Sequence, residues 1–224
     1  MTVLGAVIAG ALAGAGTGWA AGPLLRRCPE PADNEDKPLT YRALATPRFR
    51  TGVALIAAAA TLTAWTFVPL PLLPLWLVGS TLGVLTAVVD AALTWVPARL
   101  SHLTWGTTAL ALVSVGLLTG SWTAVLTAAV AAVTVGLVFL VVWRLTYPEL
   151  GFADVRSAPV VAALAASLGV SGLFAAGLGT TMVALVHLFI RRARPSRGLQ
   201  PYIPAMIAGP FLAAVLLAAS ISTP

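Results

Sequence analysis

Charged residues and cysteine are both scarce in this chain. Asp, Glu, Lys and Arg make up 9% of its 224 residues, whereas 59% are hydrophobic, and the mean hydropathy is +0.96. So little polar surface cannot cover a water-soluble globule of this size, which excludes a soluble domain. We therefore expect membrane lipid to be the solvent of most of the chain.

The single cysteine, Cys28, excludes an internal disulfide bond. Without a second cysteine or a nearby histidine it cannot build a zinc site, and we predict neither a metal ion nor a cofactor. Lysine is nearly absent too: Lys37 is the only one, so arginines supply most of the basic charge. These arginines lie between apolar runs, where they set the orientation in the membrane. The pI of about 10.7 therefore predicts no nucleic-acid partner.

Apolar runs long enough to cross a bilayer recur along the chain. Crossing the hydrocarbon layer takes roughly 20 apolar residues in a helix, and clusters of Pro, Gly and Arg separate eight runs, of which the sixth is short. This pattern predicts an all-α fold, a polytopic transmembrane helical bundle of about eight spans. The expected spans are 3–22, 51–68, 72–95, 102–118, 122–146, 156–169, 171–190 and 203–220.

The basic residues fall in alternate loops of this arrangement. Because Lys and Arg collect in short cytoplasmic loops, the pattern predicts a multi-pass protein of the cell membrane with both termini outside the cytoplasm. The residues that carry this prediction are Arg26, Arg27, Lys37, Arg42, Arg48, Arg50, Arg99, Arg144, Arg156, Arg191, Arg192, Arg194 and Arg197.

Glycines recur at every fourth position of the first span. Gly10, Gly14, Gly18 and Gly22 share one face of the expected helix. Because glycine lets another backbone approach closely, we expect this face to pack against a neighbouring helix.

Two of the seven acidic residues are placed at membrane depth. Four lie in the polar segment 23–50 and Glu149 lies in a later loop, which leaves Asp90 near the end of the third span and Asp154 at the start of the sixth. The predicted topology puts both at the cytoplasmic side. Intramembrane carboxylates are costly and generally face the bundle interior, where they have a function.

Two neighbouring carboxyl groups in a site of low dielectric constant can share one proton. The ionised group then takes a proton from a water molecule, while the protonated group donates to a carbonyl oxygen. Asp90 and Asp154 are therefore candidate catalytic residues of an aspartyl protease.

The residues around both aspartates resemble the prepilin peptidases, polytopic relatives of the preflagellin peptidases among the GxGD-type intramembrane aspartyl proteases. In that family an Asp at the cytoplasmic end of a span is followed by Leu-Pro, and here Asp90 is followed by Val96 and Pro97. The family's second Asp ends a Gly-x-Gly-Asp motif followed by Val and a basic residue. The segment 151–156, Gly-Phe-Ala-Asp-Val-Arg, is similar.

The last span resembles the family's closing span, which is rich in proline and carries Gly-Pro-Phe. Here that segment contains Pro204, Gly209 and Pro210. The resemblance covers about residues 51–220. It implies a division into residues 1–50, a first transmembrane helix with a short cytoplasmic loop, and residues 51–224, a peptidase-like transmembrane helical domain. It also implies motif or substrate-binding roles for Gly151, Ala153, Arg156, Pro97, Pro204, Gly209 and Pro210.

The function implied by the resemblance is removal of the short basic leader from prepilin-like or pseudopilin-like precursors, with the active site facing the cytoplasm. An acidic patch in the first loop, Glu30, Asp33, Glu35 and Asp36, is a candidate contact for that leader. The loop lacks the paired cysteines of family members that also methylate the new amino terminus, so no methyltransferase activity is predicted. The sequence leaves the oligomeric state open.

Three other hypotheses remain. Paired intramembrane acids also build proton or ion pathways in transporters, although a carrier usually binds near the midplane of the membrane. A second hypothesis starts from Ala153, which replaces the second glycine of the motif and suits a catalytically inactive relative that acts as a scaffold in pilus or secretion assembly. Under the third, the aspartates are interhelical polar contacts to Arg156 or to backbone groups.

Overall fold

Helices account for all the regular secondary structure in the part of the chain that the structure describes. That structure is a computed structural model, which describes residues 2–30, 40–146, 151–192 and 201–221. The helices are α1 (Val3–Arg26), α2 (Tyr41–Leu44), α3 (Pro47–Phe67), η1 (Leu70–Leu72), α4 (Leu73–Val78), η2 (Gly79–Gly83), α5 (Val84–Leu93), α6 (Ala98–Thr119), α7 (Trp122–Thr146), α8 (Phe152–Ser167), α9 (Gly169–Arg192) and α10 (Ile203–Ile221).

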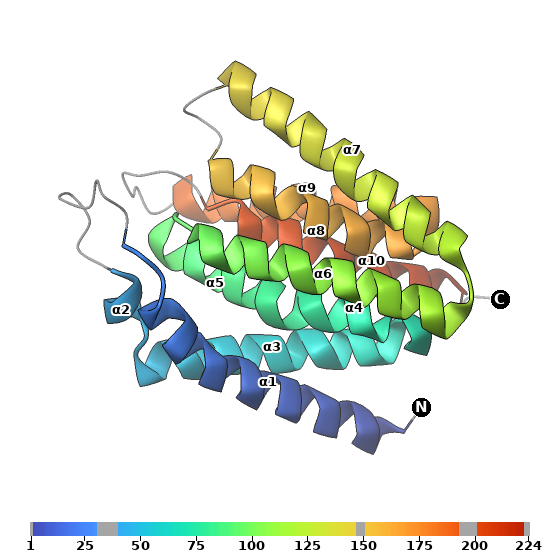
Figure 1. Ribbon diagram of the computed structural model, residues 1–224, viewed down its shortest axis with the longest axis horizontal. Helices are drawn as coiled ribbons and strands as arrows, with labels where there is room; N and C mark the ends of the chain where they lie inside the picture. Colours follow the sequence, from blue (N-terminus) through green and yellow to red (C-terminus); the bar gives the residue numbers. More distant parts are fainter. Residues whose placement is uncertain (1, 31–39, 147–150, 193–200, 222–224) are drawn as a thin grey trace.

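The long helices lie side by side in a bundle, with α1 and α7 at opposite edges (Figure 1). Helix α1 packs on α3, α7 on α8 and α9 on α10, and α10 also contacts α3, α5 and α8. The short segments η1, α4, η2 and α5 follow one another as a single rod, Leu70–Leu93. Each of the eight predicted apolar runs therefore corresponds to one helical rod.

Six helices in the described residues are long and apolar enough to cross a membrane, which makes the chain a multi-pass membrane protein. They are Val3–Arg26, Leu70–Leu93, Ala98–Thr119, Trp122–Thr146, Gly169–Ile190 and Ile203–Ser220. Helix α8 is not among them because it has only 16 residues. Helix α3 is not among them because Arg48 and Arg50 in its first turn and several threonines lower its hydropathy. The predicted count of about eight spans is therefore not confirmed.

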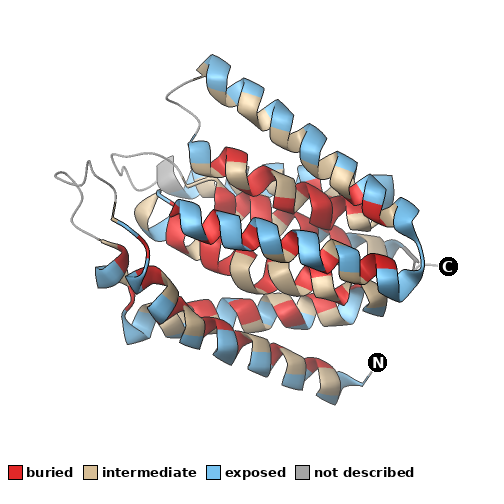
Figure 2. Cartoon of the chain, viewed as in Figure 1, coloured by how far each residue is buried: buried red, intermediate tan, exposed pale blue. Residues whose placement is uncertain are grey.

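Burial places the rod Leu70–Leu93 at the centre of the bundle. In its most apolar window 67% of the residues are buried, against 6% in α7 and 11% in α9. Buried residues concentrate on the central helices, whereas α7 exposes apolar side chains along most of its length (Figure 2). Such surfaces are expected to face lipid.

The predicted glycine face of α1 is confirmed as its contact with α3. A methyl group built on Gly14 would lie 2.5 Å from the carbonyl oxygen of Ala54, and one on Gly18 would lie 2.7 Å from that of Arg50. The Arg50 side chain then crosses back, and its Nε donates to the Gly18 carbonyl oxygen over 2.9 Å. The two backbones are thus in close contact, which only glycine permits here.

The central rod contains a π-helical turn, η2, between α4 and α5. A π turn inserts an extra residue and shifts the register of the helix that follows. Its two glycines leave room for large side chains of other helices. A methyl group added at Gly79 would meet Leu164, and one added at Gly83 would meet Ile207. Within the turn Ser80 accepts a buried hydrogen bond from Thr61 of α3 over 3.0 Å. The irregular rod is thereby packed against α3, α8 and α10.

Candidate functional site

Asp90 lies in the last turn of α5, and its side chain is 4% exposed. The helix ends four residues later at Thr94, which adopts a left-handed conformation with φ of 54° and donates its N–H to the Asp90 carbonyl oxygen over 2.7 Å. The chain then passes through Val96 to Pro97, a buried residue that caps the start of α6. Pro97, which the sequence singled out, therefore lies at the start of the next helix, seven residues after Asp90.

The Asp90 carboxyl group is bound to the start of a helix far away in the sequence. Its Oδ2 accepts a hydrogen bond from the backbone N–H of Ile203, 3.2 Å away and fully buried. Ile203 is the first residue of α10, and the first N–H groups of a helix have no partner within that helix. Asp90 therefore caps α10 and joins it to α5.

Asp154 lies in the first turn of α8 and is 6% exposed. Its backbone N–H donates to the carbonyl oxygen of Gly151, the capping residue, over 3.0 Å. Its side chain folds back over the same residue, since a methyl group built on Gly151 would lie 3.2 Å from Asp154 Oδ2. A larger residue at position 151 would crowd the carboxyl group, which is a steric reason for glycine at this position of the motif.

Asp90 and Asp154 lie near enough to each other for the charge of Asp90 to act on Asp154. Asp90 lies at the start of α10 and Asp154 at the start of α8, so the positive ends of two helix dipoles point at the pair and favour negative charge there. With little water around them, these charges act strongly on each other. Two carboxyl groups that interact in such a setting can share one proton.

Tyr202 belongs to the same site and was not predicted from the sequence. It directly precedes α10, and burial followed by the negative charge of Asp154 raises its pKa. An aromatic residue at the edge of a span is usually assigned to the membrane interface, so the sequence offered no signal for its position beside a carboxyl group.

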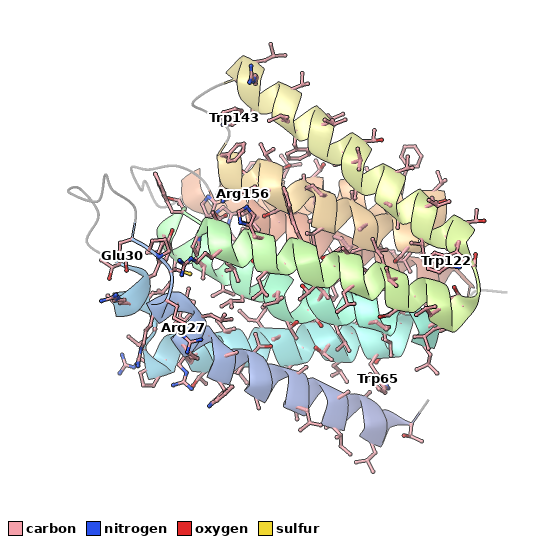
Figure 3. All side chains as sticks on the ribbon, in the orientation of Figure 1. Arg27, Glu30, Trp65, Trp122, Trp143 and Arg156 are labelled. Carbon is pink, nitrogen blue, oxygen red and sulfur yellow. The ribbon has the colours of Figure 1, made fainter. Side chains whose placement is uncertain are left out.

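Arg156 lies two residues beyond Asp154, but its side chain donates a hydrogen bond to the backbone of another segment. Its Nη2 donates to the carbonyl oxygen of Val96 over 3.2 Å, and its guanidinium carbon lies 5.4 Å from the centre of the Phe152 ring. Trp105 donates its indole N–H to the Arg156 carbonyl oxygen over 2.6 Å. Figure 3 shows Arg156 at the same end of the bundle as Arg27 and Glu30, with Trp65 and Trp122 toward the opposite end. Arg156 therefore fixes the start of α8 against α6.

The other motif residues position helices. Ala153 is half-buried and packs against the apolar core. On α10, Gly209 faces α9, where an added methyl group would lie 2.5 Å from the Ala176 carbonyl oxygen, and Pro210 is fully buried. Pro204 lines a groove beside α10. These residues pack α8 and α10 against their neighbours.

Residues of the first loop fold against this end of the bundle. Glu30 accepts hydrogen bonds from the backbone N–H groups of Tyr41 over 3.0 Å and Arg42 over 3.2 Å, so it caps α2. Tyr41 is 3% exposed, and burial raises its pKa to about 12. Glu30 thus has a structural role that the sequence did not indicate. The other three residues of the predicted acidic patch, Asp33, Glu35 and Asp36, lie outside the described residues.

A groove of about 580 Å³ runs between α3, α5 and α10. One end of the groove lies at the level of Asp90 along the bundle, since Ala91 and Pro204 directly follow Asp90 and its partner Ile203 in sequence. Thr63 is the one polar residue in a lining made up of Ile56, Ala59, Ala60, Thr63, Val84, Ala87, Val88, Ala91, Val183, Pro204, Ile207, Ala208, Phe211, Leu212 and Val215.

Among the residues that the structure describes, no three His, Cys, Asp or Glu side chains gather as a metal ion would need. No family model, no curated protein and no solved structure matches the chain.

Proposed function

We propose that the chain is an intramembrane aspartyl endopeptidase that removes the short basic leader from prepilin-like precursors at the cytoplasmic face of the membrane. The observation that carries the proposal is that two buried carboxyl groups, Asp90 and Asp154, lie near enough for one charge to act on the other, although they are 64 positions apart in the sequence. Burying two acids together is costly, and ionisable residues kept inside a membrane usually have a function.

The reaction uses both acids and one water molecule. The ionised aspartate takes a proton from the water, whose oxygen adds to the scissile carbonyl carbon, while the protonated aspartate donates its proton to the carbonyl oxygen. The C–N bond then breaks as the proton held by the first aspartate passes to the leaving nitrogen and one hydroxyl of the intermediate returns its proton to the second aspartate. The products are a carboxyl terminus on the leader and a free amine on the mature chain. No metal ion or cofactor takes part.

The apolar groove suits the hydrophobic helix that follows the leader. Along α10 its lining runs from Pro204 to Val215, which at about 1.5 Å per residue is about 16 Å, or three helical turns. Ala60, Ala87 and Ala208 keep the lining shallow, so a guest helix can approach the backbones closely. A helix lying there would place its cytoplasmic end beside Asp90.

The proposed topology has eight crossings, with α3 and α8 also in the membrane and both termini outside the cytoplasm. Arg26 ends α1, Arg99 begins α6 and Arg144 ends α7, so the basic ends alternate as the positive-inside rule requires. Helix α8 would span only about 24 Å, a mismatch that a local thinning of the bilayer accommodates.

The proposal is tested by expressing the chain together with a panel of prepilin precursors and scoring removal of the leader by gel shift. Native protein should cleave at least one precursor, whereas Asp90→Asn and Asp154→Asn should cleave none at equal expression. A Glu149→Gln variant, altered at an acid outside both the carboxyl pair and the acidic patch, is the matched control and should retain cleavage.

A catalytically inactive scaffold is the second candidate, favoured by Ala153 in the place of the motif glycine. If the native chain cleaves nothing and Ala153→Gly gains cleavage, the scaffold is the correct assignment. An ion- or proton-coupled transporter predicts instead a proton flux into liposomes that Asp90→Asn abolishes, and the peptidase predicts no such flux.

A further inference from the structure

A small cavity lies between α5, α6, α8 and α10. Its volume is about 10 Å³, enough for the centre of one water molecule. The residues around it are Gly83, Thr86, Ser101, Thr104, Trp105, Arg156, Ser157, Val160 and Ile207. Six of these nine residues carry a polar side-chain atom, although most of the surface that faces the cavity is apolar.

Two of the lining side chains have a buried polar atom without a hydrogen-bond partner in the described part of the chain. They are the Ser101 hydroxyl oxygen and the Arg156 Nε, and Ser101 is only 4% exposed. A buried polar group left unpaired is costly, and native structures pair nearly all of them with protein or water. Both of these atoms belong to residues that line the same water-sized cavity.

Three other hydroxyl groups around the cavity already use their single proton. Thr86 donates to the Leu82 carbonyl oxygen, Thr104 to that of Leu100 and Ser157 to that of Ala153. Each hydroxyl oxygen therefore remains free only as an acceptor, whereas Arg156 Nε–H can only donate. A water molecule both accepts and donates, so it can satisfy both kinds of group at once.

We propose that Ser101 and Arg156 bind one buried water molecule in this cavity, which connects α6 and α8 and lies one helical turn from both carboxyl groups. Thr86 precedes Asp90 by four residues and Ser157 follows Asp154 by three, so each lining hydroxyl shares a helix face with one aspartate. One turn corresponds to about 5.4 Å. The site therefore holds water next to the carboxyl pair. Only the use of that water in cleavage rests on the proposed function.

Binding of the water is tested by nuclear magnetic resonance on protein with isotope-labelled arginine in detergent micelles. The Arg156 Nε–H signal, assigned by its loss in Arg156→Lys, should show magnetisation transfer from a water molecule bound for longer than the tumbling time of the micelle. Ser101→Val replaces the hydroxyl with apolar atoms that fill the cavity and should abolish the transfer. Ser114→Val, on the same helix away from the cavity, should leave it unchanged.

Absence of the transfer in native protein, or its persistence in Ser101→Val, would overturn the proposal. If Ser101→Val does not fold, Ser101→Ala provides the same test, because loss of one partner should weaken the transfer several-fold. Cleavage kinetics give an independent readout: Ser101→Val should lower kcat several-fold with KM unchanged. Bound water together with an unchanged kcat would overturn its use in cleavage while the proposed function stands.

Discussion

Replacement of Asp90 by alanine and by asparagine separates its structural role from its chemical one. The Ile203 N–H that Asp90 accepts is buried, and an unsatisfied buried donor costs about 1–3 kcal/mol. Alanine removes the acceptor, but it also removes the cost of burying a carboxyl group, so we expect a net loss of about 1–2 kcal/mol in the free energy of unfolding. Asparagine keeps an oxygen that can accept from Ile203 and should cost less than about 1 kcal/mol.

The assay is equilibrium unfolding in mixed micelles, followed by the loss of helical circular dichroism as denaturing detergent is added. The expected order of stability is native, then Asp90→Asn, then Asp90→Ala, and both variants should be catalytically inactive. If Asp90→Ala is as stable as the native protein, the hydrogen bond to Ile203 does not hold α10 in place. If the two variants are equally destabilised, loss of the carboxyl charge explains the lower stability, and the hydrogen bond from Ile203 does not.

Three further predictions concern the α1–α3 contact, the groove and the first loop. Gly14→Leu should destabilise the protein by about 1–3 kcal/mol because the new side chain meets the Ala54 backbone. Gly16→Leu, with open space around it, should be neutral. Equal stability of the two variants in the same unfolding assay would contradict the close contact between α1 and α3. Ala208→Trp should fill the groove and raise KM for a precursor about tenfold, equivalent to about 1.4 kcal/mol of lost binding. Leu216→Trp, on the exposed side of α10, is the control. An identical rise in KM for both variants would show that the groove does not bind the precursor. Because the pKa of Tyr41 is raised from 10.0 to about 12, its phenol deprotonates more easily in the unfolded chain. Its contribution to stability should therefore be complete below pH 10 and disappear as the pH rises to 12. Ultraviolet absorption of the phenolate and a Tyr41→Phe control check this, and equal loss of stability in both proteins over that range would count against it.

Helix identity and one helix contact could be predicted from the sequence. Apolar runs between Pro, Gly and Arg clusters locate the helical rods because a helix in lipid must satisfy its own backbone groups. The spacing of Gly10, Gly14 and Gly18 predicts a close contact, and its partner α3 is the next long helix along the chain. Both signals are local and depend on residues fewer than about twenty positions apart.

The finer features depend on partners far apart in the sequence. The bond from Ile203 to Asp90 joins residues 113 positions apart, and the bond from Arg156 to Val96 spans 60. No periodicity in the sequence indicates such pairs. The sequence did select Asp90 and Asp154 because carboxylates are rare at membrane depth. It could not show that Asp90 caps the start of α10, or that Tyr202 lies near Asp154.

Cleavage of a purified precursor tests the central claim most directly. Native protein, Asp90→Asn and Asp154→Asn are each reconstituted in lipid nanodiscs with a precursor that carries a short basic leader before an apolar helix, and the products are identified by mass spectrometry. The account predicts a single cut between leader and helix with native protein and intact precursor with either variant. Cleavage at that position by either variant would contradict the assignment of Asp90 and Asp154 as the catalytic pair.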